Sequence, residues 1–297
     1  MSALEELLKE FEEEKPIEKV ETTPPPPKPQ PQPTPKPEIE VPKTQEVGKE
    51  TLPLSEEETA PAKTVWLIFG EKGVGKTTTA FSFPGHILVL SFDRKSSIIK
   101  YTRYNGDNRI HVFDVVKIMD YSSPDKMLES AEKTFEATLK LLDSYEKVYG
   151  KPDWVVIDGS QIMQQICEWT MRYRNKIPPF AGISNLNLWK ERRAYMRDIH
   201  NKALNVARCG VIYTTYTEVS ETIVSGEVVS KKEVPAWIDI LIYETDFVLK
   251  ADRDESSGNF LVKVVTSKDD SLIPSGKTYI VTNKHFWEVV GKNPCRG

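Results

Sequence analysis

The sequence predicts an α/β fold with a mainly parallel sheet, helices on both faces, and antiparallel β-structure at the C-terminal end. Between residues 65 and 217, short apolar runs rich in β-branched residues alternate with longer stretches of helical periodicity. This alternation is typical of buried parallel strands joined by helices. A glycine-rich loop at 70–77 separates the first apolar run from a segment that can begin a helix. After residue 217, short β-like segments replace the helical ones.

The expected elements follow one another along 65–290. Before residue 218, we expect strands at 65–69, 86–92, 110–115, 153–158 and 209–217. The longer helical patterns cover about 123–149, 160–176 and 186–208. Proline at 124 supports the first of these, since proline is favoured in the first turn of a helix. Beyond 217 we expect a hairpin that turns at Ser225-Gly226, and then strands at 245–251, 260–266, 278–282 and 286–290. We expect these strands to extend the edge of the parallel core in antiparallel fashion, not to form a separate domain.

The first 62 residues differ from the rest in composition. They hold most of the 21 prolines and carry 15 acidic against 7 basic residues, a net charge of -8. Such a stretch cannot bury a core, so we expect a disordered acidic Pro-rich arm at 1–62 and the folded domain at 63–297. Within the arm, residues 2–14 could form a short amphipathic helix with Leu4, Leu7, Leu8 and Phe11 on one face. The arm either binds a protein partner or is a solvated tail.

The bulk charge and the cysteines limit the class of protein. The whole chain carries -4, so the body after residue 62 carries +4, which is compatible with nucleic-acid binding. Cys167, Cys209 and Cys295 are far apart in sequence and form no C-x-x-C pair. This spacing argues against a zinc site or a disulfide framework and suits a reducing cytoplasm. No apolar run approaches 18 residues and no signal sequence is evident, so we expect no membrane span and a cytoplasmic location.

Residues 70–77 read G-E-K-G-V-G-K-T, a complete G-x-x-x-x-G-K-[ST] phosphate-binding loop, or P-loop. Glycines let backbone N–H groups turn toward phosphate oxygens, and the following helix N-terminus favours negative charge. We expect Lys76 to reach the β- and γ-phosphates and the Thr77 hydroxyl to bind Mg²⁺. The expected nucleotide-binding residues are Gly70, Glu71, Lys72, Gly73, Val74, Gly75, Lys76, Thr77 and Thr78.

Two acidic residues complete the predicted chemistry. Asp158 is the first polar residue after an apolar run, Val155-Val156-Ile157, and is predicted to hold the metal with Thr77. Asp93 ends the second strand and is the candidate that orients and polarises water. Either acid could instead cap the helix that follows it. Glu218 is the alternative base.

Three polar residues, Thr214, Thr215 and Tyr216, end the fifth strand. The carboxyl ends of strands line the ligand crevice in open α/β sheets, so a hydroxyl there could sense the γ-phosphate. Side chains alternate along a strand, so only some of the three can point inward, and Thr215 is the first choice. A guanine-reading N-K-x-D motif is not complete at 283–286, because Phe286 stands where Asp is needed. The sequence therefore does not look like that of a small GTPase.

In this order, the motifs resemble those of RecA-like ATPases, and more narrowly the phage and archaeal nucleotide-binding proteins associated with single-strand annealing. The matching segments are W-L-I-F-G-E-K-G-V-G-K-T, H-I-L-V-L-S-F-D, W-V-V-I-D and G-V-I-Y-T-T-Y, followed by a β-rich tail. The resemblance covers about 63–290. It implies a DNA-stimulated ATPase that binds or anneals single-stranded DNA as a homo-oligomer. The family's catalytic acid is often Glu, and the shorter Asp93 puts fast hydrolysis in doubt.

The resemblance also implies where DNA and a neighbouring subunit would bind. RecA-like proteins bind DNA through loops after the fourth and fifth strands, which correspond here to 174–190 and 218–236. The basic and aromatic residues of these segments are Arg174, Lys176, Phe180, Trp189, Lys190, Lys231 and Lys232. By position, Lys250 and Arg253 could complete a neighbouring subunit's site.

Two alternative functions stay open. One is a nucleoside or nucleotide kinase with Arg192, Arg193 and Arg197 as a phosphate clamp, and the other is a non-catalytic ATP-dependent scaffold.

Overall fold

The computed structural model describes residues 63–224, 227–236 and 240–295. The predicted arm at 1–62 and its helix at 2–14 lie outside the described residues.

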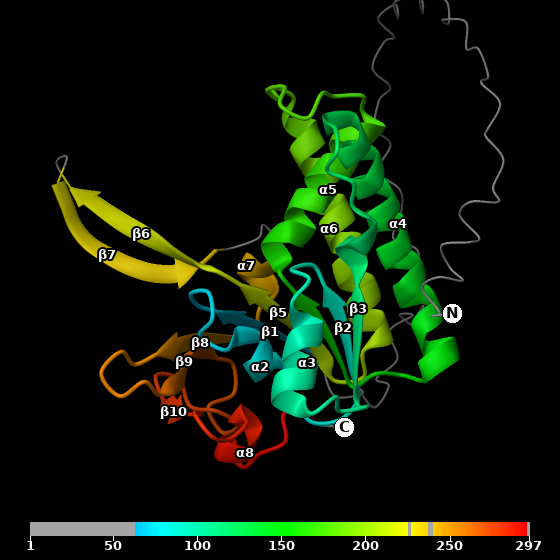
Figure 1. Ribbon diagram of the computed structural model, residues 1–297. Coiled ribbons are helices and arrows are strands. Elements are labelled where there is room, and N and C mark those ends of the chain that lie inside the picture. The colour runs from blue at the N-terminus through cyan, green and yellow to red at the C-terminus, as the bar shows by residue number, and fades with distance from the viewer. Residues whose placement is uncertain (1–62, 225–226, 237–239, 296–297) are drawn as a thin grey trace, which may run out of the picture. The chain divides into compact units, whose positions relative to one another are not determined.

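One sheet of eight strands forms the centre of the described fold (Figure 1). Its order is β10-β9-β8-β1-β5-β4-β2-β3. The strands are β1 (Thr64–Phe69), β2 (Ile87–Ser91), β3 (Ile110–Asp114), β4 (Trp154–Asp158), β5 (Gly210–Thr215), β8 (Phe247–Arg253), β9 (Phe260–Ser267) and β10 (Thr278–Ile280). All pairings from β8 to β3 are parallel, whereas β9 and β10 pair in antiparallel fashion. Because β5 lies between β1 and β4, the carboxyl ends of these three strands meet at one edge.

Helices cover both faces of the sheet. The helices are α2 (Lys76–Phe81), α3 (Ser96–Tyr104), α4 (Pro124–Tyr149), α5 (Ser160–Arg174), α6 (Leu186–Val206), α7 (Leu241–Glu244) and α8 (Phe286–Val290), with a 3₁₀ turn at Val115–Ile118. Side chains alternate along the strands: Leu67 and Val155 pack with α4, α5 and α6, whereas Trp66 and Val156 pack with α2 and α8. The predicted α/β fold class, a mainly parallel sheet with helices on both faces and an antiparallel extension at the C-terminal end, is confirmed.

Three details of the C-terminal part differ from the prediction. Residues 286–290, predicted as a strand, form α8, because Glu288 accepts a hydrogen bond from the His285 N–H at the start of the helix and Gly291 ends it in the left-handed conformation. β8 pairs with β1 in parallel, with Trp66 opposite Phe247, since the chain returns to the same end of the sheet before it enters β8. The hairpin strands β6 (Thr217–Val224) and β7 (Glu227–Pro235) form their own two-stranded sheet, which projects away from the main sheet (Figure 1).

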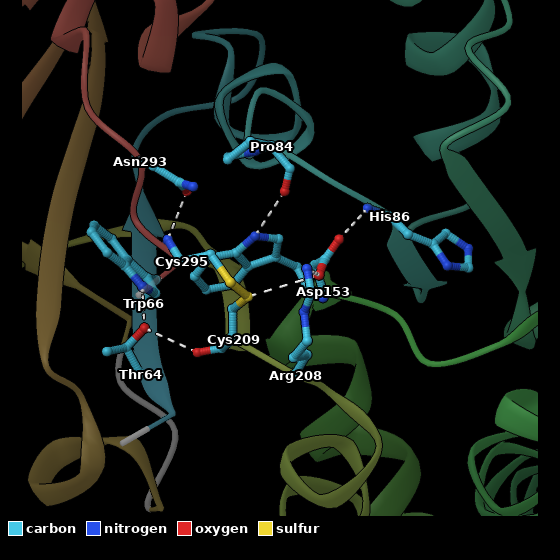
Figure 2. The surroundings of a disulfide bond; sticks show 10 residues. Thr64, Trp66, Pro84, His86, Asp153, Arg208, Cys209, Asn293 and Cys295 are labelled. Atoms are coloured by element: carbon cyan, nitrogen blue, oxygen red, sulfur yellow. Dashed lines mark hydrogen bonds and ion pairs between the residues drawn. A yellow bond between two sulfur atoms is a disulfide. The ribbon is translucent and has the colours of Figure 1, made fainter. Parts of the chain in front are cut away.

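A disulfide joins Cys209, just before β5, to Cys295 near the C-terminus (Figure 2). Their Cα atoms are 5.1 Å apart although 86 positions separate them in sequence. The expectation that the cysteines form no disulfide is therefore wrong, because spacing along the chain says nothing about distance in the fold. Asp153 lies beside the bond and contacts Arg208 and the backbone N–H of His86.

Candidate nucleotide-binding site

The P-loop connects the carboxyl end of β1 to α2, and two of its glycines are required by the backbone. Gly75 precedes α2 with φ +95°, and Gly70 has φ +156°. A Cβ on Gly70 would lie 2.2 Å from the carbonyl oxygen of Ala251 in β8, so any larger residue would collide with the neighbouring strand. The loop therefore has the left-handed backbone and the close packing that glycine permits.

Asp158 is the centre of a buried hydrogen-bond network at the end of β4. Its carboxylate accepts hydrogen bonds from the hydroxyls of Thr77 at 3.0 and 3.1 Å, Thr214 at 2.6 Å and Ser96 at 2.6 Å. Asp158 is only 1% exposed, so these hydroxyls hold the charge in a fixed orientation. A carboxylate and a hydroxyl oxygen in contact are the hard ligands that Mg²⁺ prefers, and together with a nucleotide phosphate they fit that ion.

Asp93 lies close to this carboxylate, in the turn between β2 and α3. Its side chain accepts a hydrogen bond from the backbone N–H of Lys95 at 3.0 Å. Burial, and then the neighbouring charge of Asp158, raises the pKa of Asp93 from 3.8 to about 6. A Cβ on Gly159 would lie 3.3 Å from the Cβ of Asp93, so the turn after β4 packs directly against this acid. A carboxylate that titrates near neutral pH suits general-base chemistry.

Lys76 folds back over its own loop. Its Nζ donates to the carbonyl oxygens of Gly70 at 2.9 Å and Glu71 at 2.7 Å, and lies 4.6 Å from the centre of the Tyr216 ring. Burial lowers the pKa of Lys76, while the nearby carboxylates of Asp158 and Asp93 oppose that shift. The cation thus lies within a site that already contains two acids.

The end of β5 contributes Thr214 more directly than Thr215. Thr214 bonds Asp158 and also accepts from the backbone N–H of Gly159 at 3.0 Å. Thr215 lines the same cavity, but its hydroxyl donates to the carbonyl oxygen of Ala236 at 2.8 Å, so its role as a sensor remains a prediction. Ser96, the first residue of α3, was not among the predicted site residues, and no motif marks it.

The predicted residues line one cavity of about 660 Å³. Its wall includes 72–79, Asp93, Asp158 and Thr215, whereas Gly70 and Glu71 support the loop from outside through their contacts with Lys76. The alternative base, Glu218, is exposed on β6 and is not part of the described wall. Residues 281–286 also form part of the wall, although this segment has no complete guanine-reading motif.

The basic and aromatic residues of the predicted DNA-binding segment 174–190 are partly engaged within the chain and partly exposed to solvent. In 174–190, Arg174 is paired with Glu132 and Glu136, and the Trp189 ring is half-buried under the guanidinium of Arg192. By contrast, Phe180 is 85% exposed.

The hairpin is less favourable to nucleic acid. Residues 217–235 contain four acidic and two basic residues, and Lys231 is paired with Glu221. The proposed trans cations are also engaged within the chain: Lys250 pairs with Glu233 and Asp252, and the Arg253 guanidinium lies over the Phe260 ring.

Comparisons with known proteins identify a family and similar solved structures for this chain. No curated protein matches the sequence. Among solved structures, the chain is similar to one titled "Crystal structure of the RadB recombinase", at 16% identity and a TM-score of 0.41, covering 73% of this chain and 86% of that chain. Among the described helices, none is long and apolar enough to cross a membrane. A family model described as "AAA domain" matches residues 62–295, and the chain therefore belongs to that family.

Proposed function

We propose that the protein binds and hydrolyses ATP with Mg²⁺ and acts on single-stranded DNA in recombination, annealing or replication. One observation carries the ATPase part: the P-loop hydroxyl of Thr77 is hydrogen-bonded to the buried Asp158, beside the second acid Asp93. A structural glycine turn without a ligand has no need of two neighbouring carboxylates, whose repulsion costs stability.

Each residue would have a separate task in hydrolysis. The loop N–H groups and Lys76 would hold the phosphates, and Thr77 and Asp158 would hold Mg²⁺, which neutralises phosphate charge when bound. Asp93 would accept a proton from the attacking water, since its raised pKa lets it take up a proton near neutral pH. The hydroxyls of Ser96 and Thr214 would keep the Asp158 carboxylate correctly oriented.

The segment from the end of α5 to the first turns of α6 supports the DNA part of the proposal. Phe180 and Leu186 are 85% and 74% exposed, and Lys176 and Lys190 are also exposed. Exposed aromatic groups can stack on bases while lysines follow the phosphates. We propose that the protein acts as a homo-oligomer, as the RecA-like resemblance implies.

The test is the rate of ATP hydrolysis with and without single-stranded DNA. Wild type should be stimulated by DNA, whereas Lys76→Ala and Asp93→Ala should be inactive in both conditions. Phe180→Ala should retain the basal rate and lose stimulation; Tyr101→Ala, also an exposed aromatic at 68%, is its control. Turnover indifferent to DNA, together with no salt-sensitive DNA binding, would contradict the DNA part alone.

The kinase alternative gains no support from the described cavity. Its proposed clamp residues lie on α6, and none of Arg192, Arg193 and Arg197 belongs to the described wall. Arg192 instead contacts Glu168 and Trp189. A scaffold that binds ATP without hydrolysing it would show no turnover in the same assay.

A further inference from the structure

The C-terminal segment contributes part of the wall of the cavity that the P-loop lines. We propose that residues 281–285, with Phe260 and Ile99, form the subsite for the nucleotide base, and that Asn283 reads the edge of adenine. This inference rests on the proposed ATP binding. The P-loop can account for a triphosphate, but it does not account for a wall contributed from 200 residues further along the chain.

The subsite has apolar sides. Ile99 of α3, Phe260 at the start of β9 and Val281 after β10 all line the cavity. A Cβ placed on Gly75 would lie 3.8 Å from the Phe260 ring, so this ring lies directly beside the P-loop. Apolar and aromatic side chains with a few polar groups are the usual lining of a small-molecule site. A flat heterocycle next to the phosphates fits this lining.

Hydrogen bonds tie Phe260 to the C-terminal segment. The Thr282 hydroxyl accepts from the backbone N–H of Phe260 at 3.1 Å and donates to Asn259 Oδ1 at 2.9 Å. These bonds connect the start of β9 to the residue that precedes Asn283. The Phe260 ring and Asn283 are therefore held in one structural unit.

A ring stack fastens the same segment to the end of α3, which in turn is hydrogen-bonded to the P-loop helix α2. The His285 ring lies flat on the Tyr104 ring, with centroids 4.3 Å apart and planes at 13°. The Tyr104 hydroxyl donates to the carbonyl oxygen of Thr78 in α2 at 2.5 Å. Phe286 and Trp287 follow directly and are buried in the core. The wall is thus anchored on both sides of the position where a base would lie.

Asn283 is the polar group suited to reading that base. It lines the cavity, is exposed, and its amide makes no hydrogen bond to another described residue. An amide presents a donor and an acceptor side by side, which match the amino group and ring nitrogen of adenine. Arg103 and Lys284 also line the cavity but supply only donors. The amide is therefore the group in this subsite that can satisfy both positions of adenine.

The experiment compares ligands with and without a base, using the full chain and calorimetry in the presence of Mg²⁺. ATP, GTP and inorganic tripolyphosphate are titrated into wild type, Asn283→Ala, Asn283→Asp and Phe260→Ala, with Asn108→Ala as a control on an exposed turn. Asn283→Ala should weaken ATP about tenfold and leave tripolyphosphate within about twofold. Asn283→Asp should raise the ratio of GTP to ATP affinity, because an acceptor-only group matches the paired donors of guanine. Phe260→Ala should weaken both nucleotides and spare tripolyphosphate.

Two results would overturn the inference. One is an equal loss of ATP and tripolyphosphate affinity in Asn283→Ala, which would place its effect on the phosphates or the fold. The other is unchanged ATP affinity in both Asn283→Ala and Phe260→Ala, which would place the base elsewhere. Failure of the proposed nucleotide function looks different: wild type would bind neither ATP nor tripolyphosphate, or Lys76→Ala would bind tripolyphosphate as tightly as wild type.

Discussion

Replacing Asp93 with asparagine should stabilise the nucleotide-free protein above pH 6 while it abolishes ATP hydrolysis. In the folded protein the pKa of Asp93 is about 6, raised from 3.8 by burial and by Asp158. Between these two pH values, the folded protein keeps a proton that the unfolded chain has released. The free energy of unfolding therefore falls as pH rises from about 4 to about 6, and the full cost persists above pH 6. Asparagine has no such cost at any pH.

The size of the effect follows from the shift. Two pKa units correspond to about 3 kcal/mol if fully expressed. Because Asp93 is only half-buried, solvent screening reduces this to about 1–2 kcal/mol. For a folded body of this length, such a gain raises the melting temperature by about 3–6 °C. The loss of a general base should lower turnover by about 10² or more.

Thermal unfolding of both proteins in EDTA, without nucleotide, at pH 4.5 and pH 7.5 measures the difference. The variant should melt higher at pH 7.5, and the two curves should approach each other at pH 4.5. Asp198→Asn, a change of an exposed acid on α6, is the matched control and should move neither curve. A variant that melts at or below the wild-type temperature at pH 7.5 would refute the reasoning that Asp93 is a destabilised carboxylate.

Four further outcomes are expected. Hydrolysis by wild type should fall about tenfold per pH unit below about pH 6, as Asp93 takes up its proton, which a pH–rate profile would show. Thr214→Val should lower turnover about tenfold by freeing the Asp158 carboxylate; Thr215→Val, whose hydroxyl bonds Ala236 instead, should lower it less in the same assay. Gly210→Ala should prevent folding, seen by circular dichroism, because its Cβ would lie 1.9 Å from the Thr64 carbonyl oxygen; Gly182→Ala, with open space around it, should fold normally. Cys295→Ser should cost up to about 4.5 kcal/mol of unfolding free energy, measured by denaturant titration, and reductant should do the same to wild type but not to the variant.

The strands before residue 217 could be predicted to within about two residues because their signal is local. β2, β4 and β5 are apolar runs bounded by polar or glycine residues, and α4 begins at Pro124 as its sequence indicates. The C-terminal part depends on packing. Phe286-Trp287-Glu288-Val289-Val290 has the composition of a strand, but the contact of Glu288 with the His285 N–H and the left-handed Gly291 give a short helix there. The direction of β8 depends on the path of the chain before it, which periodicity does not reveal.

Site residues that belong to a sequence motif or directly end a predicted strand could be identified from the sequence. Thr77 and Asp158 are close because β1 and β4 end at the same edge of the sheet, and each is marked by its sequence context. Ser96 carries no such mark, since its contact with Asp158 depends on how α3 packs. The wall at 281–285 contains only an incomplete N-K-x-D pattern, and its place beside the P-loop is not marked in the sequence, because the chain returns there only after crossing β8, β9 and β10.

The disulfide changes what a break in the chain would mean. Every peptide bond between Cys209 and Cys295 lies inside a covalent ring that includes the projecting β6–β7 hairpin. A protease that cuts once within this hairpin would leave two pieces that remain one molecule until a thiol reductant separates them. The strand beside the P-loop and the last residues of the chain would stay joined after such a cut, so nicked protein could keep its nucleotide site intact.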